Sequence, residues 1–511
     1  MRSKIGDARL DRGSDRALIW WAVAFAAVSV LVTGYRVYFH NQALQIPLIR
    51  MLGGTPYPND PFAATLPYYA SMVWRVVALA AKIIPLEPLL LVLFAAERVL
   101  VIYAAGNLAL ALAPKSRIAT IAAMALFASD PVPIIGGGTL VLPYFEQTGL
   151  AIALLLMAMA AFYRRRPLAW AIWLGAAFEC NSLYGVFALT YFTAAFAIDS
   201  EYRRDWRGWV RPMGVFAALA APAIVLSMGT VGGGGSELWL AAARSRVPHH
   251  IFPSTWPAIK FARFAMLVLV TGLSALCVTR CAGLMAGVRR HLLVWAGVGV
   301  AWVLIAGAAE AIGSPSMLLF QPARATDLWY AFGAIGLLAT YLATVRKSSV
   351  IALILLVIFH PTGAAGVLDH PLVGSPGQSM RQVCDWARTH TPDYAVFLVN
   401  PNWGEFRAMS ARPAFVTWKD GSALLWHRPF ARPWAERMRA LGYDVSKGEL
   451  PGERVNGILD RLYDSMSDDD ALRLAARYGV RYWVVPASHT SSLPTVFRNR
   501  YWRVLNAAGR R

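Results

Sequence analysis

Long apolar runs alternate with short polar or basic segments along most of this chain. Most of these runs approach the roughly 20 residues that a helix needs to cross the hydrocarbon core of a bilayer. The pattern predicts membrane-spanning helices at about residues 17–35, 88–112, 117–135, 147–163, 167–179, 182–198, 212–229, 258–279, 291–309, 322–344 and 348–367. We therefore expect a polytopic α-helical membrane protein with about 11 transmembrane helices.

Two stretches depart from a simple series of crossings. Residues 66–85 are apolar but carry Arg75 and Lys82, which are seven residues apart and share one helical face, so we expect a helix lying in the membrane interface. Residues 167–198 are too long for one crossing, and we expect two short helices broken near Asn181. Such a break is tolerated only where protein or a water-filled cavity satisfies the freed backbone groups.

The pattern changes after about residue 369. Helical and strand patterns alternate there, with helices expected near 380–389, 432–441 and 467–478 and strands near 395–400, 414–418 and 480–485. Ser467 precedes three aspartates and Gly479 follows, which are typical first and last residues of a helix. We expect a transmembrane domain at 1–369, with a long first loop at about 36–87, and a C-terminal extracytoplasmic α/β domain at 370–511.

Composition supports a membrane protein, because the 511 residues are 57% hydrophobic and only 15% charged. The net charge of +20 is located mainly in short clusters between the apolar runs. Such clusters mark the cytoplasmic side and contact lipid headgroups, so we expect a bilayer and no nucleic acid as partner. They predict an integral protein of a bacterial inner (plasma) membrane, with a cytoplasmic N-terminus and a periplasmic or extracellular C-terminal domain.

This topology places several ionisable residues in loops on one side of the membrane. The acidic ones are Asp60, between Pro58 and Pro61, then Asp130 and Glu146. The basic ones are Arg246, His249, His250 and Arg324, and the last of these begins a late span. Ionisable groups at membrane depth are costly and mark sites or pathways, and a guanidinium can bind a phosphate through two hydrogen bonds.

In this order of features the chain resembles the GT-C superfamily, integral-membrane glycosyltransferases that use polyprenyl-linked sugars as donors. The resemblance covers most of the chain: an acidic first loop with an interfacial helix, a second acidic loop, a later loop with histidines, a late arginine and a C-terminal α/β domain. Many members have two acidic residues in the first loop, separated by one residue, whereas this chain has Asn59-Asp60 there. A lone carboxylate is similar to members that need no metal ion.

The resemblance implies transfer of a sugar from a polyprenyl-phosphate-linked donor to a glycan, lipid or protein acceptor. Asp60 would be the general base or would position the acceptor, with Asp130 and Glu146 as the second acidic loop. Arg324 would hold the donor phosphate, with His249, His250 and Arg246 nearby. The resemblance makes no cofactor certain; a divalent cation, Mg²⁺ or Mn²⁺, is possible, with its ligands unknown.

Other interpretations of the same residues remain. Asp60 can cap the helix that follows it, Asp130 can belong to a turn, and Glu146 can begin a helix. His249 and His250 can bind a metal, or one of them can pack while the other lines the site. A flippase for a lipid-linked oligosaccharide and a non-catalytic scaffold are the alternative functions.

Overall fold

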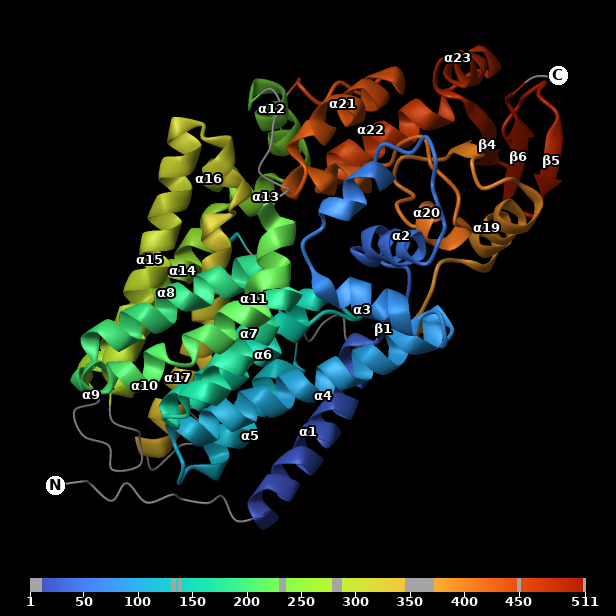
Figure 1. The fold of residues 1–511 in the computed structure, drawn as a ribbon. Coiled ribbons are helices and arrows are strands. Elements are labelled where there is room, and N and C mark those ends of the chain that lie inside the picture. Colours follow the sequence, from blue (N-terminus) through green and yellow to red (C-terminus); the bar gives the residue numbers. More distant parts are fainter. Residues whose placement is uncertain are drawn as a thin grey trace.

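The computed structural model describes residues 12–129, 135–136, 140–228, 236–277, 287–344, 372–447 and 452–508. A bundle of helices forms one part of the molecule, and the C-terminal region lies across one end of it (Figure 1). The main helices of the bundle are α1 (Arg12–Thr33), α4 (Leu86–Leu112), α5 (Arg117–Ala128), α6 (Gln147–Tyr163), α7 (Pro167–Cys180), α8 (Ser182–Ile198), α11 (Met213–Met228), α14 (Ala258–Cys277), α15 (Val288–Ile312) and α17 (Ala325–Thr344).

Every span predicted up to residue 344 overlaps one of these helices, but α5 ends at Ala128, short of the predicted end at 135. The predicted span at 348–367 lies outside the described residues, so the count of 11 crossings stays a prediction. In the described part of the chain, four stretches of helix are long and apolar enough to cross a membrane: Arg16–Thr33, Leu86–Leu112, Trp206–Met228 and Val288–Ile312. The protein is therefore a membrane protein. Short helices α9 (Ser200–Arg204) and α10 (Trp206–Val210) lie at the end of the bundle away from the C-terminal region (Figure 1).

The predicted break in the long apolar stretch is confirmed. Helix α7 ends at Cys180, and Asn181 has an extended backbone before α8 begins at Ser182. The Asn181 side chain accepts a hydrogen bond from the Tyr184 amide and so caps α8. The Cys180 carbonyl, left free by the break, accepts a hydrogen bond from the Ser71 hydroxyl at 2.8 Å.

The first loop folds into helices α2 (Gln42–Leu52), η1 (Ala63–Tyr68) and α3 (Met72–Ala80). The expected single helix at 66–85 is thus divided at Tyr69–Ser71, and Arg75 donates to the carbonyls of Tyr69 and Ser71 there. A two-residue strand β1 (Tyr35–Arg36) pairs in parallel with β2 (Val373–Gly374), which joins the start of this loop to the start of the C-terminal region.

The C-terminal region combines helices with a four-stranded sheet in the order β3-β4-β6-β5. Its strands are β3 (Val396–Leu398), β4 (Val480–Pro486), β5 (Thr495–Arg498) and β6 (Trp502–Asn506), and its longer helices are α19 (Gln378–His390), α21 (Ala431–Ala440), α22 (Gly452–Asp464) and α23 (Asp468–Tyr478). Strand β3 is parallel to β4, and the other pairs are antiparallel. The expected strand at 414–418 is wrong, because Ala414 makes only one isolated bridge, to Phe397.

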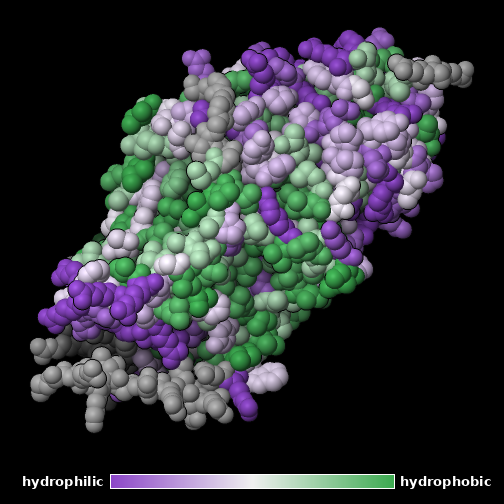
Figure 2. Space-filling model, in the orientation of Figure 1, coloured by the Kyte–Doolittle hydropathy of each residue, from purple (hydrophilic) through white to green (hydrophobic). Residues whose placement is uncertain are grey.

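Two hydrophobic cores organise the molecule. One lies within the helical bundle, and the other joins the C-terminal region to α2, η1, α3 and α12 (Ser236–Arg246). The first loop therefore packs as part of the C-terminal region. The surface agrees with this division: apolar side chains cover much of the bundle, and hydrophilic ones predominate over the C-terminal region (Figure 2).

Candidate functional site

A cavity of about 1250 Å³ lies between the bundle and the C-terminal region. The bundle contributes the start of α6, the break between α7 and α8, the end of α11, and the segment from α16 (Pro315–Leu319) to η3 (Pro322–Arg324). The C-terminal region contributes Asn402, Gly404, Glu405, Trp418, Lys419, Ser422, Leu425, Trp426, Arg428 and Asn456. Glu146, Arg246, His249, His250 and Arg324, predicted as site residues, all line this cavity.

Glu146 caps the N-terminus of α6 and also faces the cavity. One carboxylate oxygen accepts from the Thr148 amide at 2.6 Å, and the other from Gln45 Nε2 at 3.3 Å. Its own amide donates to Glu97 on α4, at 3.1 Å. Burial raises the pKa of Glu146, against the opposing effects of the Thr148 hydrogen bonds and the Arg324 charge. Glu146 thus begins a helix and lines the cavity at the same time, so the two interpretations of this residue are compatible.

Arg324 lies in η3, just before α17, where its guanidinium is held by two neighbours. One terminal nitrogen donates to Gln321 Oε1 at 3.1 Å and the other to the Tyr184 hydroxyl at 3.2 Å. The Arg324 guanidinium is charged, because arginine is not deprotonated in proteins. Its Nε is buried and has no hydrogen-bond partner among the described residues. A cation with a free donor beside a cavity can bind an anion.

His249 and His250 lie side by side on α13 (Pro248–Ile251), with ring centroids 4.0 Å apart. Both line the cavity, whereas the sequence led us to expect only one of them there. Burial lowers the pKa of His249 to about 3, and that of His250 also lies well below its ordinary value. Both rings are therefore neutral at pH 7, and their assignment beside the donor phosphate stays a prediction. His250 Nδ1 lies 3.2 Å from the Gly136 carbonyl, which can only accept, so Nδ1 carries the proton.

The C-terminal side of the cavity carries three further basic residues, Arg246, Lys419 and Arg428. Arg246, on α12, donates to the Trp418 carbonyl at 2.7 Å and to the Ser422 hydroxyl at 3.1 Å. Lys419, which sequence reasoning missed, donates to Asn41 Oδ1 at 2.9 Å. Burial, and then the Arg246 charge, lower the pKa of Lys419 to about 7. No local motif marks Lys419, because its neighbours in the cavity are distant in sequence.

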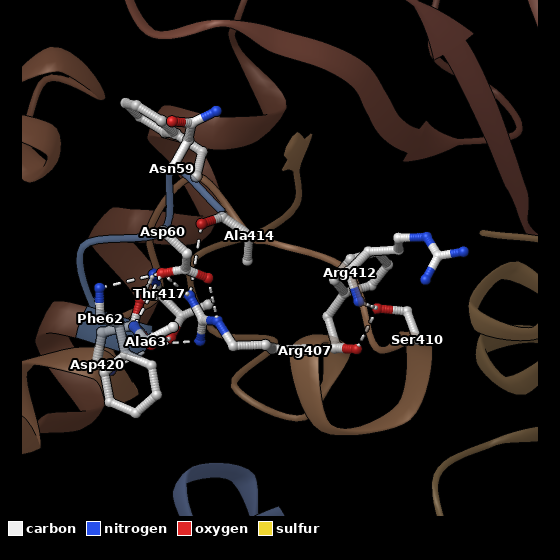
Figure 3. Close-up of polar contacts among 12 residues, drawn as sticks. Asn59, Asp60, Phe62, Ala63, Arg407, Ser410, Arg412, Ala414, Thr417 and Asp420 are labelled. Carbon is white, nitrogen blue, oxygen red and sulfur yellow. Dashed lines mark hydrogen bonds and ion pairs between the residues drawn. The ribbon is translucent and has the colours of Figure 1, made fainter. Parts of the chain in front are cut away.

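Asp60 lies outside this cavity, in a buried ion cluster (Figure 3). Arg407, on α20 (Phe406–Ser410), donates through Nε to Asp60 at 2.5 Å and through a terminal nitrogen to Asp420 at 2.8 Å. Asp60 also accepts from the amides of Phe62 and Ala63, at 3.0 and 3.3 Å. These contacts agree with the cap interpretation of Asp60. Its role as the catalytic base gains no support from this position.

Asp130 lies outside the described residues, so its assignment to the second acidic loop stays a prediction. Among the described residues, no three His, Cys, Asp or Glu side chains gather closely enough to hold a metal ion. The use of Mg²⁺ or Mn²⁺ therefore also stays a prediction, and such a cation has no assigned ligands.

The arrangement of the helices, with a cavity between the bundle and the C-terminal region, is that of a membrane protein with GT-C-like architecture. A comparison with solved structures supports this: arabinofuranosyltransferase AftD from Mycobacteria, solved as a mutant by single-particle cryo-EM, is similar with a TM-score of 0.50. The similarity covers 97% of this chain but only 42% of that one, at 15% sequence identity. At this identity the likeness concerns the fold.

Two sequence comparisons add little about activity. Residues 378–441 match a family described as a domain of unknown function, DUF6798. That segment includes Arg407, Lys419 and Asp420, and so both the ion cluster and one side of the cavity. No curated protein matches the chain.

Proposed function

We propose that the protein is a membrane glycosyltransferase that moves a sugar from a polyprenyl-phosphate-linked donor to a glycan, lipid or protein acceptor. The observation that carries the proposal is that Glu146 and Arg324 line the same cavity, beside the break between α7 and α8. The GT-C-like architecture supports glycosyl transfer at the level of the superfamily. The donor, the acceptor and the roles of the residues belong to the proposal.

The bundle side of the cavity suits a polyprenyl phosphate. Its apolar lining comes from Phe178, Leu183, Val186, Ile224, Met228, Leu319 and Phe320. Arg324 lies beside these side chains with an unused buried donor, which a phosphate oxygen would satisfy. His249 would add a neutral N–H donor. A polyprenyl chain in contact with the apolar lining would place its phosphate at Arg324.

Glu146 is the proposed general base. The acceptor hydroxyl oxygen would form a bond with the anomeric carbon of the sugar, and the bond from that carbon to the phosphate oxygen would break. The hydroxyl proton would pass to Glu146, and the polyprenyl phosphate would leave with the bonding electrons. A raised pKa suits a carboxylate that accepts a proton near neutral pH, and Arg324 would stabilise the charge on the departing phosphate.

Binding of a short-chain polyprenyl phosphate to the full chain in nanodiscs tests the donor site. The wild type should bind saturably, and Arg324→Ala should weaken binding by about tenfold to a hundredfold, because a charge-assisted hydrogen bond contributes about 1.5–3 kcal/mol. Arg324→Lys should fall between them, because lysine keeps the charge but loses the fork geometry. Arg204→Ala, an exposed arginine on α9, is the matched control.

Three outcomes would count against the proposal. A folded wild type that does not bind polyprenyl phosphate would remove its basis. Equal weakening by Arg204→Ala would show a general effect of charge on membrane binding. Movement of a polyprenyl-linked sugar across the bilayer of proteoliposomes, without transfer to any acceptor, would favour the transporter alternative.

A further inference from the structure

The C-terminal side of the cavity differs in chemistry from the bundle side. Asn402, Glu405, Trp418, Ser422 and Trp426 contribute polar and aromatic side chains there, and Lys419 and Arg246 are two of its cations. In the part of the chain that the structure describes, neither cation has a carboxylate oxygen within 4.0 Å. Lys419 and Arg246 repel each other, and Glu405 and Glu146, which also line the cavity, oppose this effect on Lys419 without forming an ion pair with it. An anion bound beside both cations would therefore be favourable.

Lys419 is held in place by its surroundings. Its Nζ uses one of three donors on Asn41 Oδ1, at 2.9 Å, and the remaining donors have no partner among the described residues. Gly404 packs against its stem so closely that a Cβ at that position would lie 2.8 Å from the Lys419 Cβ. Any side chain at 404 would therefore displace the lysine. Gly404 thus leaves room for the stem of Lys419.

Arg246 is fixed beside it by bonds to the backbone and to a hydroxyl. Its Nε donates to the Trp418 carbonyl and a terminal nitrogen to Ser422, neither of which neutralises its charge. The guanidinium also lies over the Trp418 ring, 5.5 Å from its centroid. Burial lowers the pKa of Arg246 to about 10, which leaves it charged at pH 7. Arg246 therefore keeps a positive charge on this side of the cavity.

Groups suited to a sugar line the same side of the cavity. Asn402 has a buried Oδ1 without a hydrogen-bond partner in the described structure, although its amide nitrogen bonds Asp460 at 2.8 Å. Trp426 lines the cavity and is held by Tyr69, whose ring lies perpendicular to it at 5.0 Å. A sugar hydroxyl can donate to such an oxygen, and a sugar ring can pack on an indole face.

We propose that Lys419 and Arg246 bind the carboxylate of a uronic acid in the acceptor, so that the acceptor is an anionic glycan or glycolipid. The carboxylate would accept charge-assisted hydrogen bonds from Lys419 and from the open side of Arg246. Asn402 and Trp426 would contact the ring of the same sugar. That this sugar belongs to the acceptor rests on the proposed transferase function. The binding of an anionic sugar at Lys419 and Arg246 does not depend on that function.

Competition between small sugars in ligand-detected NMR tests the site on the full chain in nanodiscs. Methyl glucuronide should bind about tenfold more tightly than methyl glucoside, which has the same ring without the charge. Lys419→Met should remove this preference and leave polyprenyl phosphate binding unchanged. Lys419→Arg should restore it, which guards against a folding defect in the methionine variant. Lys447→Met, an exposed lysine of the same region, is the matched control.

Glucose 6-phosphate and inorganic phosphate separate the sources of the negative charge. Equal binding of methyl glucuronide and methyl glucoside would overturn the proposal, as would a preference that survives Lys419→Met. Tighter binding of glucose 6-phosphate or phosphate than of methyl glucuronide would also overturn it and assign Lys419 to a phosphate. Loss of polyprenyl phosphate binding alone, with the glucuronide preference intact, would instead contradict the donor site.

Discussion

Asp60→Asn should weaken the fold without removing donor binding. The Asp60 carboxylate accepts four hydrogen bonds, two from backbone amides and two from Arg407. An asparagine keeps one acceptor oxygen for the amides, but its NH₂ group then faces the Arg407 donor. One charge-assisted hydrogen bond is lost, which costs about 1.5–3 kcal/mol of the free energy of unfolding.

Arg407→Leu should cost more, because it leaves Asp60 and Asp420 buried and unpaired. Their side chains are 1% and 3% exposed, so water cannot replace the guanidinium. Breaking a buried pair from one side costs about 3–5 kcal/mol. The order of stability should be wild type, then Asp60→Asn, then Arg407→Leu.

Thermal unfolding in detergent, followed by tryptophan fluorescence, measures this order, and binding of polyprenyl phosphate measures function. Asp60→Asn should melt at a lower temperature than the wild type and still bind the phosphate below that temperature. An Asp60→Asn protein with unchanged melting but no sugar transfer would refute the reasoning. It would return Asp60 to the catalytic role that the sequence suggested.

Two further predictions concern the cavity. The first is that Glu146→Gln keeps an acceptor for the Thr148 amide but cannot take a proton. The rate of sugar transfer should fall about 10²–10⁴-fold, while polyprenyl phosphate binding is retained. An unchanged rate in a transfer assay would exclude Glu146 as the base. Methyl glucuronide binding should weaken about tenfold from pH 6 to pH 8, because only protonated Lys419 binds and its pKa is about 7. The groups that act on or face this lysine are Arg246, Glu405, Glu146, His40, His249 and His250. Between pH 6 and pH 8, none of these other groups gains positive charge: the carboxyl groups and His40 can only lose protons, His249 and His250 stay neutral, and Arg246 stays charged. The affinity for methyl glucuronide should therefore fall with pH. An affinity that rises with pH would contradict the assignment to Lys419.

Local signals in the sequence were sufficient for the helices. Most of the apolar runs up to residue 344 have the right position, and Asn181 breaks one of them because its side chain caps the next helix. Ser467 and Asp470 form the capping box expected of a helix start, and Gly479 adopts a positive φ of 73° at its end. These features depend on residues a few positions apart, so the sequence alone contains them.

Long-range contacts were not predictable in this way. Asp60 and Arg407 are 347 residues apart, and nothing near either residue indicates the other. Asp60 between two prolines looks like an exposed loop acid, and only the packing of the first loop against the C-terminal region buries it. The segment at 414–418 has the composition of a strand, but Thr417 and Trp418 lead into the 3₁₀ helix η5 (Lys419–Leu425) instead.

The ion cluster and the cavity are physically connected through η5. Asp420, held by Arg407, is the residue next to Lys419, and Thr417 donates to Asp420 through both its amide and its hydroxyl, at 2.8 and 2.7 Å. The same contacts that fasten the first loop to the C-terminal region therefore fix the start of η5. Asn41, the partner of Lys419, belongs to that first loop. Asp60 thus affects the cavity by holding together the two segments that position Lys419, although its own carboxylate lies outside it.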